Sequence, residues 1–427
     1  MRILWLKSEL LHPVDKGGKI RTYQMLKAIK REHEVTYLSF ASVDDSAEAF
    51  KCSSEYCHRL ITVPRDEPRR FSARFYRELA FNLCSRLPYA IEKYRSSAMR
   101  TAIERELRAS SYDVVVCDFL VPSINLPRLP GATSILFQHN VESTIWRRHF
   151  ETQTSRLRRA FFYGQWQKMQ AYERAICRRF DCVVAVSDVD RDQMRDEFGL
   201  SEVYEVPTGV DTDYFRPANS ATGGFELVFT GSMDWLPNED AILHFTRDVF
   251  PRIAASIPEV SLTVVGRNPS AALKALAATD RRITVTGRVE DVRTYVGRAA
   301  AYVVPIRIGG GTRLKIYEAM AMEKPVISTG VGAEGLPVRD GEDLLIADGP
   351  EAFADAVVRV LQDVDLARWL GRNAGTVVRE RFGWERASAR FIEVCENAAA
   401  ARARRESLPS PDRQLGGKLV PVPIAKR

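Results

Sequence analysis

The sequence predicts an α/β protein built from two doubly wound, parallel-sheet domains. Short apolar runs alternate along its 427 residues with stretches of helical periodicity, an alternation typical of parallel strands joined by helices. Ten such runs precede residue 330, which fits two sheets better than one. A stretch rich in Pro, Gly, Asn and Ser near residues 203–225 separates them into two groups.

The predicted strands are rich in Val, Ile and Leu, as expected when a parallel sheet is buried on both faces. In the first domain they are Ile3–Leu6, Val35–Phe40, Val114–Cys117, Ser134–Phe137 and Cys182–Val186. In the second domain they are Leu227–Thr230, Leu262–Val265, Ile283–Thr286, Ala301–Val304 and Val326–Ser328. Intervening segments such as residues 18–30 and 239–257 have the apolar spacing of helices.

These patterns set the expected domain boundaries. The first domain spans residues 1–205, an interdomain linker spans 206–223, and the second domain spans 224–383. We expect a last helix over residues 384–400 to pack back towards the first domain. Residues 401–427 are basic and proline-rich with few apolar side chains, so we expect a disordered tail.

Composition favours a soluble globular protein, with 45% hydrophobic and 27% charged residues. No window approaches 18 uninterrupted apolar residues, so we expect no transmembrane helix. The opening MRILWLKSELLHP reads as a buried strand rather than a signal peptide. Seven dispersed cysteines favour a reduced, cytosolic setting. Cys52, Cys57 and His58 lie close in sequence, but no second ligand pair follows at zinc-site spacing, and we expect no metal site.

The net charge of +7 is concentrated in one segment. Between Trp146 and Phe180 nine Arg or Lys residues face only two acidic ones, Glu151 and Glu173, and aromatic side chains are interleaved with them. This pattern is typical of a surface that meets anionic lipid headgroups. An ordinary amphipathic helix with its aromatic residues in the core is the alternative. The usual nucleic-acid-binding signatures are missing, and we expect no nucleic-acid partner.

The most informative segment lies between two predicted strands of the second domain. It contains the glycine run Gly309, Gly310 and Gly311, and a helix is predicted to begin at Thr312. Free N–H groups of such a loop and of a helix N-terminus form a natural seat for phosphate. The sequence therefore predicts an anion-binding loop here.

Lys315 and Glu318 lie three positions apart, so they share one face of this predicted helix. A cation above phosphates, together with a carboxylate that accepts hydrogen bonds from a sugar diol, suits a nucleotide sugar. The same spacing is also compatible with a salt bridge on a solvated helix.

Several other predicted strands are also followed by loops that contain glycine or polar residues. Ligands of doubly wound domains bind beyond the carboxyl ends of the strands, so we expect these ends to line one site between the domains. The residues concerned are Gly17, Gly18, His139, Gly231, Gly266, Arg288 and Val289.

Three segments, PTGVDTDYF, VTGRVEDVRTY and VVPIRIGGGTRLKIYEAMAMEKPVIST, resemble the retaining family-4 glycosyltransferases of GT-B fold. Two others, PVDKGGKIRTYQML and QHNVES, resemble a bacterial branch of that family linked to exopolysaccharide synthesis. The likeness runs in order over about residues 1–391. It implies two Rossmann-like domains that face each other across a cleft.

The resemblance also implies an activity. It is the transfer of a hexose from a nucleotide-diphosphate sugar to a lipid-linked or polysaccharide acceptor, with retention of configuration and without a metal cofactor. The implied location is the cytoplasm, peripheral on the inner face of the plasma membrane, with the anionic membrane surface contacted by residues 146–180.

Residue roles follow from the resemblance position by position. The second glutamate of the family's paired-glutamate motif falls on Glu318, which is expected to accept hydrogen bonds from the ribose. The first would fall on Gly310, so that glutamate is missing, and the N–H groups of Gly310 and Gly311 are candidates to hold the donor sugar. Lys315 and the neighbouring Arg313 match basic positions near the diphosphate. Both are catalytic candidates, because cations stabilise a departing diphosphate.

Three further positions in the first domain and two in the second are matched. Gly17 and Gly18 match a glycine turn near the phosphates and the acceptor. His139 matches a histidine that contacts the donor sugar or diphosphate, and it is the third catalytic candidate. Arg288 and Val289 match a loop that meets the nucleobase through backbone groups.

Alternatives remain open. A nucleotide-sugar epimerase of the same fold would bind the same donor without an acceptor, and Gly310 leaves room for a non-catalytic nucleotide-sugar-binding protein. A two-domain dehydrogenase would need Gly-x-Gly-x-x-Gly after a strand, and we expect no such run in this chain. Three carboxylate pairs imitate a metal-binding Asp-x-Asp motif, and we interpret them as helix caps and linker residues. They are Asp188 and Asp190, Asp211 and Asp213, and Asp363 and Asp365.

Overall fold

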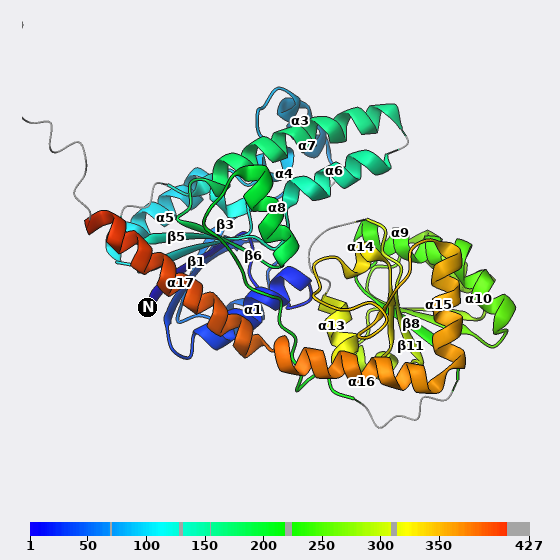
Figure 1. Cartoon of the computed structure of the whole chain (residues 1–427). Coiled ribbons are helices and arrows are strands. Elements are labelled where there is room, and N and C mark those ends of the chain that lie inside the picture. Colours follow the sequence, from blue (N-terminus) through cyan, green and yellow to red (C-terminus); the bar gives the residue numbers. More distant parts are fainter. Residues whose placement is uncertain (69–70, 128–130, 154, 218–223, 309–313, 408–427) are drawn as a thin grey trace, which may run out of the picture.

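Each half of the chain contains one parallel β-sheet flanked by helices (Figure 1). The computed structural model describes residues 1–407 except 69–70, 128–130, 154, 218–223 and 309–313. All strand pairings in the two sheets are parallel. The predicted fold class, two doubly wound Rossmann-like domains, is therefore confirmed.

The first sheet has the strand order β3-β2-β1-β4-β5-β6-β7. Its strands are β1 (Arg2–Lys7), β2 (Glu34–Ala41), β3 (Arg59–Pro64), β4 (Val114–Asp118), β5 (Thr133–Phe137), β6 (Cys182–Ala185) and β7 (Val203–Glu205). The helices around it are α1 (Gly17–Ile29), α2 (Ala47–Lys51), α3 (Ala73–Leu83), α4 (Tyr89–Glu92), α5 (Ser97–Ala109), α6 (Glu142–Thr152), α7 (Arg156–Cys177) and α8 (Asp188–Phe198).

The second sheet has the order β10-β9-β8-β11-β12-β13. Its strands are β8 (Glu226–Thr230), β9 (Ser261–Val265), β10 (Ile283–Gly287), β11 (Ala301–Val304), β12 (Val326–Ser328) and β13 (Leu345–Ile346). Its helices are α9 (Leu236–His244), α10 (Phe250–Ser256), α11 (Ala271–Thr279), α12 (Arg293–Arg298), α13 (Leu314–Ala321), α14 (Gly330–Ala333), α15 (Pro350–Gln362) and α16 (Val364–Arg381). A short π-helical turn, Phe245–Val249, joins α9 to α10.

The ten predicted strands all occur, but β3, β7 and β13 are not among them. All three lie at sheet edges. β3 is only partly buried, β7 has three residues and β13 has two. An edge strand has one pairing partner and less apolar surface to cover, so its sequence pattern is weak.

The last helix, α17 (Trp384–Ser407), belongs to the first domain although it follows the second (Figure 1). Phe391 packs against Trp5 and Phe137, with ring centroids 5.4 and 5.2 Å apart. The helix continues beyond residue 400, where the sequence prediction ended it. Arg402 lies within this extension and pairs with Asp181 at 3.2 Å. This contact ties residues that were expected to be disordered to the first domain.

The chain crosses between the domains twice, and the two crossings touch. The N–H of Val210 donates to the carbonyl of Phe382 at 2.7 Å. A Cβ atom at Gly209 would lie 2.6 Å from the Trp384 ring, so glycine allows the close approach. The two adjacent crossings therefore form one narrow connection between the domains.

Candidate functional site

The carboxyl ends of the two sheets meet where α1 and α13 come together. A Cβ atom at Gly17 would lie 3.5 Å from Cδ1 of Leu314, the first residue of α13. Asp15, just before α1, forms an ion pair with Arg267, which follows β9. The guanidinium of Arg148 on α6 donates to both carboxylate oxygens of Glu334, at 2.7 and 2.6 Å. The strand-end loops of both domains therefore border one region, as doubly wound folds require of a ligand site.

Three predicted residues of the second domain lie in direct contact. Lys315 donates to Oδ1 of Asn238 at 2.8 Å, and its ammonium lies 4.0 Å from the centroid of the Phe229 ring. A Cβ atom at Gly231 would lie 2.7 Å from Nζ of Lys315. One at Gly266 would lie 1.7 Å from the Gly231 carbonyl oxygen. Only glycine fits at either position, and together they leave room for the lysine at the end of the sheet.

Glu318 lies one turn further along α13 and is partly buried. Burial raises the pKa of its carboxyl to about 7, although the nearby Lys315 ammonium opposes this. When this carboxyl group is ionised, burial leaves it with few water molecules. Hydroxyl groups of a ligand could then donate the hydrogen bonds that water no longer supplies.

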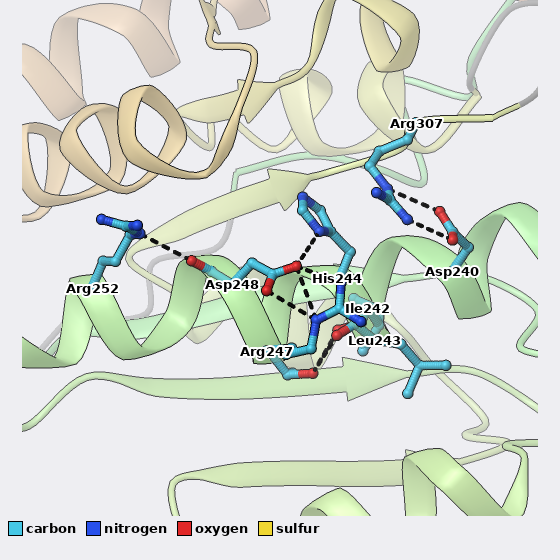
Figure 2. A network of polar contacts seen from close by, with 9 residues as sticks. Asp240, Ile242, Leu243, His244, Arg247, Asp248, Arg252 and Arg307 are labelled. Atoms are coloured by element: carbon cyan, nitrogen blue, oxygen red, sulfur yellow. Dashed lines mark hydrogen bonds and ion pairs between the residues drawn. The ribbon is translucent and has the colours of Figure 1, made fainter.

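The predicted phosphate loop itself, with Gly309, Gly310, Gly311, Thr312 and Arg313, lies outside the described residues. The segment that leads into it is anchored. Figure 2 shows Arg307 beside Asp240 of α9, with two hydrogen bonds of 3.1 and 2.7 Å between them.

Arg288 and Val289 follow β10, the edge strand of the second sheet. Arg288 is exposed, and Val289 packs against the core of the second domain. Because β9 and β8 separate β10 from β11, this pair lies at the margin of the cluster around Lys315.

In the first domain, His139 lies against a buried carboxylate that the sequence analysis missed. Its Nε2 is 2.9 Å from Oδ1 of Asp118, the last residue of β4. The other oxygen, Oδ2, accepts from Trp5 Nε1, Lys7 Nζ and Thr22 Oγ1 at 2.8, 3.0 and 2.6 Å. Both oxygens of Asp118 are thus in contact with polar groups.

The charges within this network are fixed by burial and pairing. Although burial opposes its ionisation, Lys7 and His139 hold the pKa of Asp118 well below its usual range. Burial lowers the pKa of His139 to about 3, even though Asp118 acts in the opposite direction. His139 is therefore a neutral imidazole at physiological pH, able to donate or accept a hydrogen bond without changing charge.

Phe119 joins His139 to the glycine turn. Its ring stacks on the imidazole with centroids 3.9 Å apart, and a Cβ atom at Gly18 would lie 2.7 Å from Cζ of that ring. Phe119 has a φ of 69°, a left-handed conformation that is unfavourable for an aromatic residue. Gly18 and His139, both predicted site residues, are thus brought together through a strained residue that no sequence pattern indicated.

One set of side chains in the part of the chain that the structure describes could hold a metal ion. It consists of His12, Cys52 and Glu55, whose ligand atoms lie within 4.8 Å of one another. It differs from the trio considered in the sequence, since Nδ1 of His58 accepts from the backbone of Val35 at 3.2 Å. It lies around the first half of α1, where Tyr23 donates to Glu55 at 2.6 Å.

One expectation needs correction. The segment GVGAEG, residues 330–335, has the Gly-x-Gly-x-x-Gly spacing and follows β12. It opens only the four-residue helix α14, and its Glu334 is paired with Arg148. Dinucleotide binding needs this motif at the start of a longer helix that packs on the sheet, so the structure gives no support to a dehydrogenase.

Comparisons with known proteins agree with this geometry. Residues 16–214 match the family model "Glycosyltransferase Family 4", and residues 224–363 match "Glycosyl transferases group 1". Both halves of the chain thus match glycosyltransferase domain families, and we place the chain among the GT-B glycosyltransferases.

Individual relatives are more distant. A phosphatidyl-myo-inositol mannosyltransferase of Mycobacterium tuberculosis is 28% identical over 300 residues, covering 67% of this chain and 76% of the relative. The structure of sucrose-phosphate synthase from Thermosynechococcus elongatus covers 94% of this chain and 100% of its own, with a TM-score of 0.70 at 19% identity. Anabaena HepE, solved with UDP and glucose, covers 93% and 100%, with a TM-score of 0.67 at 13% identity. At these identities the two structures establish the shared fold.

Proposed function

We propose that this glycosyltransferase moves a hexose from a nucleotide-diphosphate sugar to a lipid-linked or polysaccharide acceptor with retention of configuration, in the synthesis of an exopolysaccharide or cell-envelope glycan. The observation that carries the proposal is the position of Lys315. It is held by Asn238 at the carboxyl end of the second sheet, and it follows Leu314, which packs against the glycine turn of the first domain. A cation is thereby presented where two doubly wound domains meet.

This arrangement suits the departure of a nucleoside diphosphate. Breaking the bond between the sugar and the phosphate leaves negative charge on the diphosphate. Lys315 and the N-termini of α1 and α13 supply positive charge for it, so we expect no metal requirement. The departing phosphate can itself take the acceptor proton, and neutral His139 is available to contact the donor sugar.

Glu318 is proposed to hold the ribose. Its position one turn after Lys315 would set a carboxylate beside the nucleoside when the lysine contacts the phosphates. Where the paired-glutamate motif lacks its first member, at Gly310, backbone N–H groups are proposed to contact the donor sugar.

The acceptor side is proposed to lie near the membrane. Helices α6 and α7 pack together as a hairpin, and aromatic residues such as Phe150 and Trp166 stack between them with ring centroids 5.8 Å apart. Those rings therefore serve the hairpin, whereas Leu157 at the start of α7 is 86% exposed and is flanked by exposed arginines. No helix among the described residues is long and apolar enough to cross a membrane. We therefore propose peripheral attachment to the cytoplasmic face through this basic end.

Thermal stabilisation by UDP, GDP, ADP and their sugar conjugates tests the donor site. One nucleotide series should raise Tm strongly, and the matching nucleotide sugar should be hydrolysed slowly in the absence of an acceptor. Stabilisation without any turnover, even with acceptor present, would identify a binding protein instead. If no nucleotide raises Tm, the proposal of a donor site is wrong.

Glu318→Ala tests the ribose contact. We expect nucleotide affinity to fall by about 10- to 100-fold, the effect of losing about 1.5–3 kcal/mol of charge-assisted hydrogen bonding, with the unliganded Tm preserved. Glu323→Ala, on the same segment but paired with Arg379 at 2.9 Å, is the control. Unchanged affinity in the Glu318 variant would remove that residue from the site.

Binding to vesicles that contain anionic lipid tests the membrane surface. Changing Arg156, Arg158 and Arg159 together to Glu should abolish it. A matched reversal of three exposed arginines of the second domain, Arg252, Arg281 and Arg359, should leave most of it intact. Equal losses in both variants would indicate a non-specific effect of net charge.

A further inference from the structure

Four cationic side chains are buried in the part of the chain that the structure describes: Lys7, Lys19, Arg21 and Lys324. Three of them have acceptors within the protein. The acceptors are Asp118 for Lys7 at 3.0 Å, Glu9 for Lys19 at 3.5 Å, and the carbonyls of Gly297 and Ala299 for Lys324. Arg21 is 4% exposed, and its guanidinium has neither a hydrogen bond nor an ion pair with any described residue.

A buried guanidinium without a partner is unfavourable, because it loses its water and gains nothing in exchange. Burial lowers the pKa of Arg21 only to about 10, so the side chain keeps its charge at neutral pH. Asp118, Asp190 and Glu205 contribute a favourable field, but none of them forms an ion pair with it. Such a group is expected where a ligand supplies the missing anion.

The position of Arg21 agrees with that expectation. It lies in the second turn of α1, and long side chains on a helix lean towards its N-terminus. The N-cap residue, Lys16, makes no side-chain cap, and the first turn contains no acidic residue. The N–H groups of Gly17 and Gly18 consequently have no acceptor among the described residues. The 13-residue helix α1 therefore presents a positive end beside a positive side chain.

The surroundings place this group at the domain boundary. Arg21 and Tyr317 of α13, in the second domain, influence each other's pKa, so the two side chains lie near each other. Asp15 and Gly17, just before it on the chain, contact Arg267 and Leu314 of the second domain. A ligand at Arg21 would therefore touch the first domain from the side that faces Lys315.

We propose that Arg21 binds a phosphate group of a substrate, beside the first turn of α1 whose positive end the proposed function already uses. A planar guanidinium together with free backbone N–H groups matches the several oxygens of a phosphate. The proposal rests on the proposed function, since the phosphate belongs either to the nucleotide-sugar donor or to a phosphorylated acceptor.

Arg21→Met gives a signature that a structural arginine would not give. Removing an unpaired buried charge should raise the Tm of the unliganded protein by about 1–3 °C. The same change should abolish stabilisation by the phosphate ligand. Arg21→Lys keeps the positive charge but lacks the planar guanidinium that can donate two hydrogen bonds side by side, so it should retain part of that stabilisation. Lys324→Met is the matched control: it removes a buried cation that has acceptors, so it should lower Tm and leave ligand stabilisation unchanged.

Two probes distinguish the source of the phosphate: the better of UDP and GDP, and a short prenyl phosphate such as farnesyl phosphate. Loss of the nucleotide shift in Arg21→Met assigns the site to the donor. Loss of only the prenyl phosphate shift assigns it to the acceptor. If both shifts survive, or if the unliganded variant is less stable than the wild type, Arg21 is structural and the inference is wrong.

Failure of the two proposals can be told apart. A wild-type protein that no nucleotide stabilises contradicts the proposed donor site, whereas the prenyl phosphate arm still tests Arg21. A wild-type protein that responds to neither probe overturns the inference as well. A wild-type response that Arg21→Met retains in full overturns only the inference.

Discussion

The two strand edges at the domain boundary are built differently. At the edge of the first domain, Asp118 is fully buried and in contact with Trp5, Lys7, Thr22 and His139. At the edge of the second domain, Lys315 is partly buried and has Asn238 as its hydrogen-bond acceptor. A network of buried charges fixes the positions of its side chains, and replacing any one of them is strongly destabilising. The first edge is therefore a network of buried charges, whereas the second presents a partly buried cation held by an amide and an aromatic ring.

Asp118→Ala should break the first edge and produce the largest effect. It would leave the ammonium of Lys7 buried without its counter-ion, which typically costs about 3–5 kcal/mol of unfolding free energy. Urea unfolding followed by tryptophan fluorescence and circular dichroism measures this loss. Glu393→Ala removes an exposed ion pair to Arg390 and should change stability by about 1 kcal/mol or less. A similarly small loss for Asp118 would mean that the buried network is not what holds this edge.

Lys315→Ala should give the opposite phenotype, with stability nearly preserved and activity lost. A single group that stabilises a departing anion is typically worth about 3–4 kcal/mol of barrier, or a 100- to 1,000-fold change in kcat. Steady-state kinetics on the donor identified by thermal stabilisation measures this change. Lys274→Ala, an exposed lysine of α11, should leave kcat unchanged. Normal turnover by the Lys315 variant would remove that residue from the chemistry.

This difference between the edges also explains what the sequence could predict. Gly231, Gly266 and Lys315 come together as expected, because each follows a strand or opens a helix in a glycine pattern that can be read from spacing. The fold was predictable for a similar reason, since ten of its strands are clear apolar runs. The edge strand β3 escaped because its exposure weakens that signal.

The first edge was harder to predict because its polar residues are hidden in apolar runs. Lys7 and Asp118 are the last residues of β1 and β4, directly after the predicted strands Ile3–Leu6 and Val114–Cys117. Extending each strand by one residue would have placed both side chains at the carboxyl edge. Asn238, by contrast, lies 77 positions from Lys315, and no local pattern connects them.

Glu142→Gln should change how the stability of the first domain depends on pH. Burial raises the pKa of Glu142, the first residue of α6, to about 7, compared with about 4.3 for an exposed glutamate. Between these values the folded protein binds a proton that the unfolded chain releases, so stability falls as pH rises through this window. Urea unfolding should therefore show that Glu142→Gln gains about 3–4 kcal/mol over the wild type at pH 8, with little gain at pH 4.5.

The control is Glu151→Gln, an exposed position on the same helix, which should leave the pH dependence of stability unchanged. Glu318 at the second edge has its pKa raised to about 7 by the same cause, so Glu318→Gln should reproduce the gain. A gain at one edge and not at the other would show that burial of these two carboxyls differs in solution.

Arg148→Ala should have the smallest effect, because it removes a salt bridge between the two domains and leaves the residues of each strand edge unchanged. Its bidentate bonds to Glu334 join side chains that are 21% and 32% exposed, so solvent screening limits the pair to about 1 kcal/mol. Because the pair is made only when α6 and α14 are close, its loss should favour separation of the domains and raise the donor KM by about 2- to 5-fold with little change in kcat. Arg293→Ala, which breaks an ion pair with Asp291 inside the second domain, should leave KM unchanged. A double-mutant cycle with Glu334→Ala provides the decisive measurement: if the two changes in ln KM are additive, the pair does not couple donor binding to domain contact.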